Sequence, residues 1–309
     1  MSNLSQKLFV PITAIACMAS LYAQQDKSDE TFQSAKEMLD SPAGDDSSRL
    51  LGFGLMRQAA DQGNTKAQSI VGYHFAQGDV VPANSQDALD YLTRAATGGD
   101  TFAAKNLRHL CESFNANPPS HNKQAFQSLQ SAADAGAIPA AAQVAELFYF
   151  GCDGVTPQDY VQAAAYLRLA ADGGDLKSAN MLGVILEEGL AGGKDEELAA
   201  KYFEKAAQEG DAKAQANLGR AFISGYGVDR DFIKAFMWLQ LSALQGEPTG
   251  KHTLADFIRG LSYEQICEGN QRVSNFLKSR GENLSAEELT KKIFETPALE
   301  PLPTNPTKS

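Results

Sequence analysis

The chain has 309 residues, of which 43% are hydrophobic and 21% are charged, and this composition argues against wholesale disorder. Its 38 acidic residues outnumber 27 basic ones, giving a formal net charge of −11. Binding to nucleic acid or to an anionic membrane surface relies on clustered cations. We therefore expect neither of these two functions.

The first segment of the chain is typical of a secretory signal peptide, which we assign to residues 1–23. Lys7 precedes an apolar run over residues 8–19, and small residues then lead into the polar sequence QQDKSDE. One alternative is a lipoprotein signal with acylation at Cys17, and another is a cytosolic chain with an apolar N-terminus. No later stretch approaches the ~20 apolar residues of an integral membrane span. We expect export to the periplasm or the medium, or a lipid anchor in the outer membrane at Cys17.

A repeat of about 36 residues organises the rest of the chain. The pattern Ala-Ala-x-x-Gly, with Ser-Ala-x-x-Gly in the last copy, ends at glycines spaced 36 to 38 residues apart. These glycines are Gly63, Gly99, Gly136, Gly174, Gly210 and Gly246. Small and apolar residues hold fixed positions relative to them, with spacings of three, four and seven. Such spacings indicate helices.

Each repeat is expected to contain two helices, A and B. Helix A covers stretches such as residues 67–77, 140–150 and 214–224 and ends at a glycine, which adopts a left-handed conformation cheaply. Helix B covers stretches such as residues 85–97, 160–172, 196–208 and 232–244. Tyr166, Tyr202 and Trp238 share one helix-B position, so we expect them to fill the core between repeats rather than form an aromatic binding site.

Together the repeats predict an all-α domain over residues 27–280, an α/α solenoid wound as a right-handed superhelix of about six helix-turn-helix units. The units are residues 27–63, 64–99, 100–136, 137–174, 175–210 and 211–246. A cap over residues 247–280 contains a helix that opens with the capping box Ser262-x-x-Gln265. We expect a short helix in residues 281–295 and disorder in the proline-rich residues 296–309.

Residues 211–246 resemble the unit of the SEL-one-like repeat (SLR) family, which is related to the tetratricopeptide repeats. They contain Ala-x-x-x-Leu-Gly at 214–219, Gly-x-Gly-Val at 225–228 and Lys-Ala-x-x-Trp-Leu at 234–239. The unit at 100–136 departs most, with Arg108 in place of a glycine. The resemblance implies a bacterial exported protein that binds other proteins. Members with a cysteine pair in every unit have been linked to β-lactam binding or hydrolysis, an activity we do not expect here because those cysteines are missing.

No enzyme motif is present in the sequence. It has no Walker loop, no HExxH, no GxSxG and, after residue 23, no Cys-x-x-Cys. His74 and His109 lie on helices A of adjacent units, but nothing completes a zinc ligand set, so we expect no metal and no cofactor. Three cysteines follow residue 23, an odd number that permits one disulfide within the chain. The pairing Cys111–Cys152 is one option.

The candidate binding site is the inner wall of the superhelix, formed by helix-A positions that point away from helix B. Aromatic side chains surrounded by charges are typical of peptide-binding interfaces. The predicted groove residues are Tyr73, Phe102, His109, Glu146, Tyr149, Phe150, Glu187 and Arg220. The alternative is that some of them pack against neighbouring helices or lie under the loop at 115–123.

The sequence thus favours an exported scaffold without catalytic activity that binds a protein or peptide in this concave groove. The alternative is a cell-envelope protein that binds or hydrolyses peptidoglycan or a related polymer. A groove carboxylate with a shifted pKa would distinguish the second function, and the candidates are Glu146 and Glu187.

Overall fold

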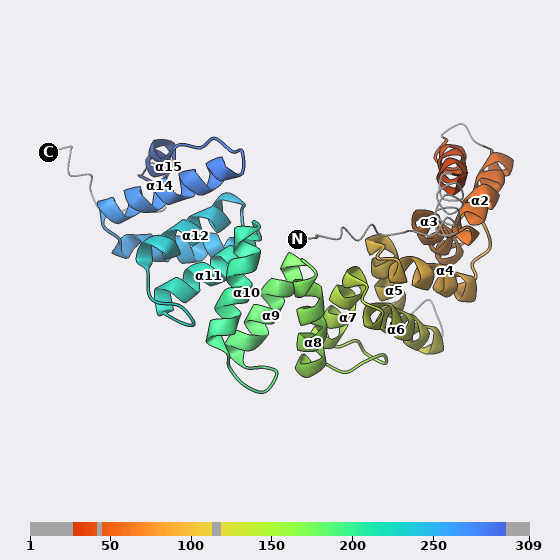
Figure 1. Ribbon diagram of the computed structural model, residues 1–309, viewed down its shortest axis with the longest axis horizontal. Helices are drawn as coiled ribbons and strands as arrows, with labels where there is room; N and C mark the ends of the chain where they lie inside the picture. Colours follow the sequence, from red (N-terminus) through yellow and green to blue (C-terminus); the bar gives the residue numbers. More distant parts are fainter. Residues whose placement is uncertain (1–26, 42–44, 113–118, 295–309) are drawn as a thin grey trace, which may run out of the picture. The chain divides into compact units, whose positions relative to one another are not determined.

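The computed structural model describes residues 27–41, 45–112 and 119–294. These residues form helices joined as successive hairpins (Figure 1), which confirms the all-α repeat fold. None of the described helices combines the length and the apolar character that crossing a membrane requires. The expected signal peptide, Cys17 and the proline-rich tail lie outside the described residues. The chain divides into two compact units, Met1–Gln158 and Asp159–Ser309, and each is described by itself.

The first unit begins with a helix over residues 27–39. It continues with α2 (Asp46–Asp61), α3 (Thr65–Gln77), α4 (Ser85–Thr97), α5 (Thr101–Glu112), α6 (Pro119–Asp134) and α7 (Ile138–Phe150). Helix α3 forms a hairpin with α4, and α5 forms one with α6. Helices A of successive repeats are also in contact. Helix α5 packs against both α3 and α7.

The second unit contains α8 (Tyr160–Asp172), α9 (Leu176–Glu188), α10 (Glu196–Gln208), α11 (Ala212–Ser224) and α12 (Phe232–Leu244). Helix α13 (Pro248–Phe257) leads through the short 3₁₀ turn Ile258–Gly260 to α14 (Tyr263–Ser279) and α15 (Ala286–Phe294). Helix α14 packs on α12, and α15 packs on α14. The predicted capping box at Ser262 and Gln265 is confirmed at the start of α14.

The helix bounds follow from local signals that recur in every repeat. The predicted helix-B ranges 85–97, 160–172, 196–208 and 232–244 are confirmed as α4, α8, α10 and α12. An Asn or Asp before most of the helices accepts hydrogen bonds from backbone N–H groups of the first turn, which would otherwise have no partner. These N-cap residues are Asn64, Asp175 and Asp211 before helices A and Asn84, Asp159, Asp195 and Asp231 before helices B.

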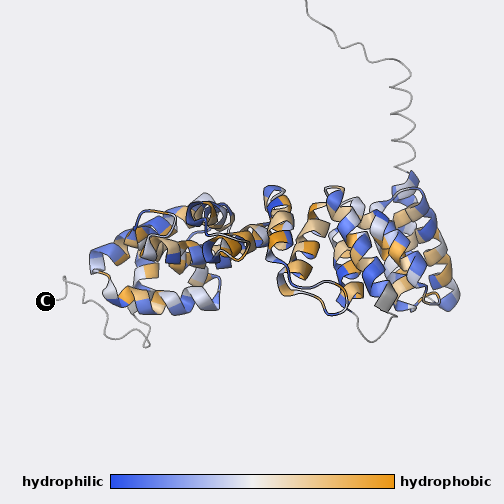
Figure 2. Ribbon diagram, turned by 90° about the horizontal axis from the view of Figure 1, so that it is seen from below, coloured by the Kyte–Doolittle hydropathy of each residue, from blue (hydrophilic) through white to orange (hydrophobic). Residues whose placement is uncertain are grey.

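Helices A and B approach each other closely where a glycine of helix A faces a large side chain of helix B. A Cβ atom added to Gly219 would lie 2.7 Å from Cγ of Leu239, and one added to Gly183 would lie 2.5 Å from the Phe203 ring. Leu239 and Phe203 are almost completely buried. Apolar and polar residues alternate along the helices (Figure 2), so the apolar ones meet at these contacts and the polar ones remain outside.

Cationic side chains stabilise the carboxyl ends of several helices B. Nη2 of Arg94 donates a 3.2 Å hydrogen bond to the carbonyl of Ala60 at the end of α2. Nζ of Lys205 donates one of 2.7 Å to the carbonyl of Ala171 at the end of α8. Arg280 reaches from α14 to the end of α10 with bonds of 2.7 and 2.9 Å. The last carbonyl groups of a helix lack the regular hydrogen bond from the residue four positions later, and the helix dipole favours a positive charge there.

Gly227, in the loop after α11, lies against the backbone at the start of α10. Its φ is +70°, and an added Cβ would overlap the carbonyl group of Glu196. Gly227→Ala is therefore expected to lower the free energy of unfolding by at least about 2 kcal/mol, measured by urea denaturation. Gly193→Ala is the control, because its Cβ would meet nothing within 4 Å. Equal losses in the two variants would contradict the prediction.

Candidate functional site

The predicted groove residues are distributed over the helices A of both units. Tyr73 lies on α3, Phe102 and His109 on α5, and Glu146, Tyr149 and Phe150 on α7, all in the first unit. Glu187 on α9 and Arg220 on α11 belong to the second unit. The surface of α3, α5, α7, α9 and α11 that carries these eight residues is called the A-helix face below. It is described unit by unit.

Aromatic side chains make up the exposed apolar part of the A-helix face in the first unit. The rings of Tyr73 and Phe102, from neighbouring helices A, have centroids 5.5 Å apart. The rings of Tyr149 and Phe150, at the end of α7, have centroids 4.9 Å apart. Phe102 is 48% exposed and Phe150 is 64% exposed, while the two tyrosines are half-buried. Exposed phenylalanines of this kind offer apolar area that a partner can cover.

An ion-pair network ties α5 to α7 on the same face. Nη1 of Arg108 contacts Oε2 of Glu146, and Nε of Arg108 donates a 2.8 Å hydrogen bond to Oε1 of Glu112. Burial lowers the pKa of Arg108, but its hydrogen bonds with the two carboxylates outweigh that effect and raise the pKa overall. Glu146 is only 6% exposed. The Glu146 carboxylate therefore serves a structural ion pair and is not an open catalytic group.

The two histidines singled out by the sequence have different surroundings. Nδ1 of His74 lies 2.8 Å from Oδ1 of Asp79, so this histidine is tied to the loop that follows its own helix. His109 is exposed on α5. Within the residues that the structure describes, no three His, Cys, Asp or Glu side chains are grouped so that they could hold a metal ion.

Polar side chains link the helices A of the second unit. Nδ2 of Asn217 donates a 2.8 Å hydrogen bond to Oδ1 of Asn180, and Nη1 of Arg220 donates one of 3.3 Å to Oδ1 of Asn217. Neither asparagine was predicted as a groove residue. Asn217 stands three residues before the predicted groove residue Arg220, about one helical turn away, and that spacing was the available signal.

Glu187, at the end of α9, is half-buried. Burial raises the pKa of its carboxyl group, and the nearby Glu188 and Glu196 raise it further, against the opposing effect of Arg220 and Lys194. Glu187 is thus the one predicted groove carboxylate for which a raised pKa is found. A raised pKa in a single carboxylate does not supply the acid–base pair that most polymer hydrolases use.

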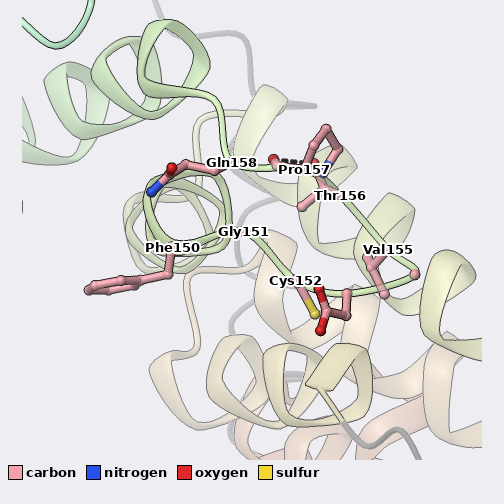
Figure 3. A pocket seen from close by; sticks show the side chains of 9 residues that line it. Phe150, Gly151, Cys152, Val155, Thr156, Pro157 and Gln158 are labelled. Carbon is pink, nitrogen blue, oxygen red and sulfur yellow. Dashed lines mark hydrogen bonds between the residues drawn. The ribbon is translucent and has the colours of Figure 1, made fainter.

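A pocket opens beside Phe150, in the loop that follows α7. Its volume is about 640 Å³, and the loop residues from Phe150 to Gln158 line it (Figure 3). The loop is pinned where N–H of Cys152 donates a 2.8 Å hydrogen bond to the carbonyl of Thr156. Thr156 is buried, whereas Asp153 and Gly154 are exposed. The pocket thus presents mainly backbone and small side chains.

Comparison with known families identifies the repeat. The Sel1 repeat model matches residues 44–64, 65–100, 138–175, 176–211 and 212–247, which is more than half of the chain. The chain therefore belongs to the Sel1 repeat family. The gap in the match, residues 101–137, is the repeat in which Arg108 replaces a glycine.

Two crystal structures share this fold. A Sel1 repeat protein from Oxalobacter formigenes is 20% identical with a TM-score of 0.58, covering 96% of this chain and 95% of that one. A protective antigen present in uropathogenic Escherichia coli strains, which displays an SLR fold, is 22% identical with a TM-score of 0.57. That match covers 96% of this chain and 62% of the antigen. At these identities the likeness shows the fold alone.

Removing the cation of the ion-pair network is expected to destabilise the first unit. Arg108→Met removes the guanidinium group that contacts the buried Glu146 carboxylate and is expected to cost roughly 2–3 kcal/mol of unfolding free energy. The double variant Arg108→Met, Glu146→Met is expected to be more stable than the single variant. Arg220→Met is the control, with a loss below about 0.5 kcal/mol, because Arg220 is exposed. A double variant that is no more stable than Arg108→Met would contradict the ion pair.

Glu187 is expected to destabilise the fold once it is ionised. Its pKa is higher in the folded chain than in the unfolded chain, so deprotonation costs more in the folded state and stability is lost as the pH rises through the folded pKa. Glu187→Gln should therefore raise the melting temperature at pH 7. The gain should vanish below about pH 4, where the native carboxyl is protonated in both states. The control is Glu282→Gln, because Glu282 is exposed and is not among the groups that shift the pKa of Glu187, and a gain that persists in acid would refute this explanation.

Proposed function

We propose that this protein is a non-catalytic scaffold that binds a protein or peptide partner on the A-helix face. Sel1 repeat proteins typically act as scaffolds for protein interaction, and membership of that family supports the coarser role. The observation that carries the finer proposal is the aromatic pair of half-buried Tyr73 and exposed Phe102, which two successive repeats build together. Tyr149 and Phe150 add a second aromatic pair in the same unit.

These aromatic rings have the properties of binding anchors. Covering the exposed half of one phenylalanine, on the order of 100 Å², contributes roughly 2 kcal/mol. A tyrosine ring adds contact area at a low cost in side-chain entropy. A partner segment with apolar side chains, in extended or helical form, would cover these rings.

The second unit offers a polar version of the same face. Asn180 and Asn217 bond to each other across two helices A, with Arg220 beside them. An amide side chain both donates and accepts hydrogen bonds, as the backbone of a bound peptide does. This part of the second unit would suit a polar or extended peptide segment.

We also propose that the protein is exported. The sequence of residues 1–23 supports this proposal, because it has a charged start, an apolar run and small residues at its end. These residues lie outside the part of the chain that the structure describes. Delivery to the periplasm or the medium follows if the signal is cleaved. Acylation of Cys17 would instead place the scaffold on the outer membrane.

The proposal predicts that removing the aromatic anchors abolishes partner capture. The full chain, tagged at its C-terminus, is recovered from envelope and medium fractions after crosslinking. The variant carries Tyr73→Ala, Tyr149→Ala and Phe150→Ala. The matched control carries Leu50→Ala, Leu51→Ala and Val161→Ala, three exposed apolar residues on helices B. Circular dichroism must first show that both variants keep the native helix content.

The native chain and the control are expected to capture the same partner, and the aromatic variant should capture at least about tenfold less. Equal capture by all three would discard the site, and a chain absent from both fractions would contradict export. Capture of peptidoglycan in place of a protein, with dependence on Glu187, would overturn the proposal in favour of the polymer-binding alternative.

A further inference from the structure

Two of the cysteines in the described residues lie side by side. Cys111, Cys152 and Cys267 are all present as free thiols. Cys111 is in the last turn of α5, and Cys152 follows α7 in the loop that encloses the pocket of Figure 3. Sγ of Cys152 donates a hydrogen bond of 3.7 Å to the backbone carbonyl of Cys111. The two residues belong to successive repeats, Cys111 to helix A of one and Cys152 to the loop after helix A of the next.

The sulfur of Cys152 lies close to Cys111. A carbonyl oxygen lies about 2.4 Å from its own Cα, so the Cys152 sulfur is within about 6 Å of the Cys111 Cα. The Cys152 sulfur is therefore within reach of the Cys111 side chain. The Cys111 thiol points back to the carbonyl of Leu107 at 3.1 Å. Rotation of the Cys111 side chain would turn its sulfur from Leu107 towards Cys152.

Neighbouring hydrogen bonds fix both ends of this contact. Nδ2 of Asn122 donates a 3.1 Å bond to the same Cys111 carbonyl that accepts from Cys152. The pair Cys152 and Thr156 exchanges two backbone hydrogen bonds, of 2.8 and 2.9 Å, that hold the loop in place. The two thiols are thus held together by the packed structure of the first unit.

The two thiols differ in access. Cys111 is completely buried, while Cys152 is half-buried and lines an open pocket. Burial raises the pKa of both thiols, and Glu112 raises both further, whereas the nearby Arg108 guanidinium lowers both. A disulfide donor from solution therefore meets Cys152 first, and Cys111 is placed to react second.

We propose that Cys111 and Cys152 form an intramolecular disulfide when the folded chain meets a small-molecule or protein disulfide. The Cys152 thiolate attacks the donor disulfide, forms a mixed disulfide and releases one donor thiolate. The Cys111 thiolate then attacks the Cys152 sulfur, forms the protein disulfide and releases the second donor thiolate. The two protons lost by the cysteines pass to the released thiolates, and the donor is the two-electron oxidant.

This bond would join two successive repeats covalently. It would fasten the pocket loop, and with it the end of α7 next to Phe150, to the end of α5. It closes a loop of about 40 residues, and such a constraint raises stability chiefly by restricting the unfolded chain. The inference rests on the thiol geometry and does not depend on the proposed binding function.

The test is thiol mapping of the full chain after oxidation by oxidised glutathione. Cys17 is replaced by Ser throughout, so that the three described cysteines are the only thiols. The fold is expected to direct the reaction to one pair of cysteines. The mass of the chain should fall by about 2 Da, one thiol should remain free, and one disulfide-linked peptide should join Cys111 to Cys152. Cys267→Ser should give the same link, whereas Cys152→Ser and Cys111→Ser should give none.

Oxidation in 8 M urea is the second arm. The unfolded chain also favours the shorter Cys111–Cys152 loop to some extent, because closing a loop costs more entropy as its length grows. Links to Cys267 should nevertheless appear in urea, whereas the folded chain should form none. Glutathione left on Cys152 without a link to Cys111, no reaction at all, or links that are equally mixed in folded and unfolded chains would each overturn the proposal.

Discussion

The close contact between a helix-A glycine and a large helix-B side chain is the constraint on which the rest of the structure depends. Gly72, Gly183 and Gly219 each let one side chain of the following helix, Leu92, Phe203 or Leu239, approach the backbone. In the repeat at 100–136 this position is Arg108, whose side chain is turned to Glu112 and Glu146 on the A-helix face. Replacement of the packing glycine by a long cationic side chain in this repeat thus coincides with an ion-pair network. The same few residues also border the two adjacent thiols, so the least regular repeat carries the most distinctive chemistry of the first unit.

The sequence predicted the helices well because each of them carries its own local signals. Helix B of residues 232–244, for example, has Asp231 as its N-cap, apolar residues at helical spacing and a glycine after its end. Contacts between repeats were harder to predict. The pairing of Arg108 with Glu146, or of Asn180 with Asn217, depends on how neighbouring helices A are rotated and shifted against each other. Periodicity within one helix does not give the rotation or the shift between neighbouring helices. The sequence therefore predicted Glu146 as a groove residue but not its ion pair with Arg108.

The A-helix face is a product of stacking rather than of any one repeat. Tyr73 and Phe102 meet only because α3 and α5 are neighbours, and Asn217 reaches Asn180 from the following repeat. Under the proposed function, a partner would therefore contact side chains from two successive repeats. Its affinity would depend on which repeats are neighbours in the chain. The family match covers the repeats that keep the packing glycine or an alanine in its place, whereas the unmatched repeat contributes Phe102 and His109.

Helix α14 has a role beyond covering the apolar surface of α12. Arg94 and Lys205 stand five residues before the glycine that ends their repeats, and the last repeat has the buried Leu241 at that position. Arg280 of α14 supplies the missing cation and bonds to the end of α10, one helix B further back. Helix α14 and the residue after it are therefore fastened to two repeats at once. A repeat inserted before residue 196 would leave this arrangement intact, because it would not separate α14 from α10 or α12.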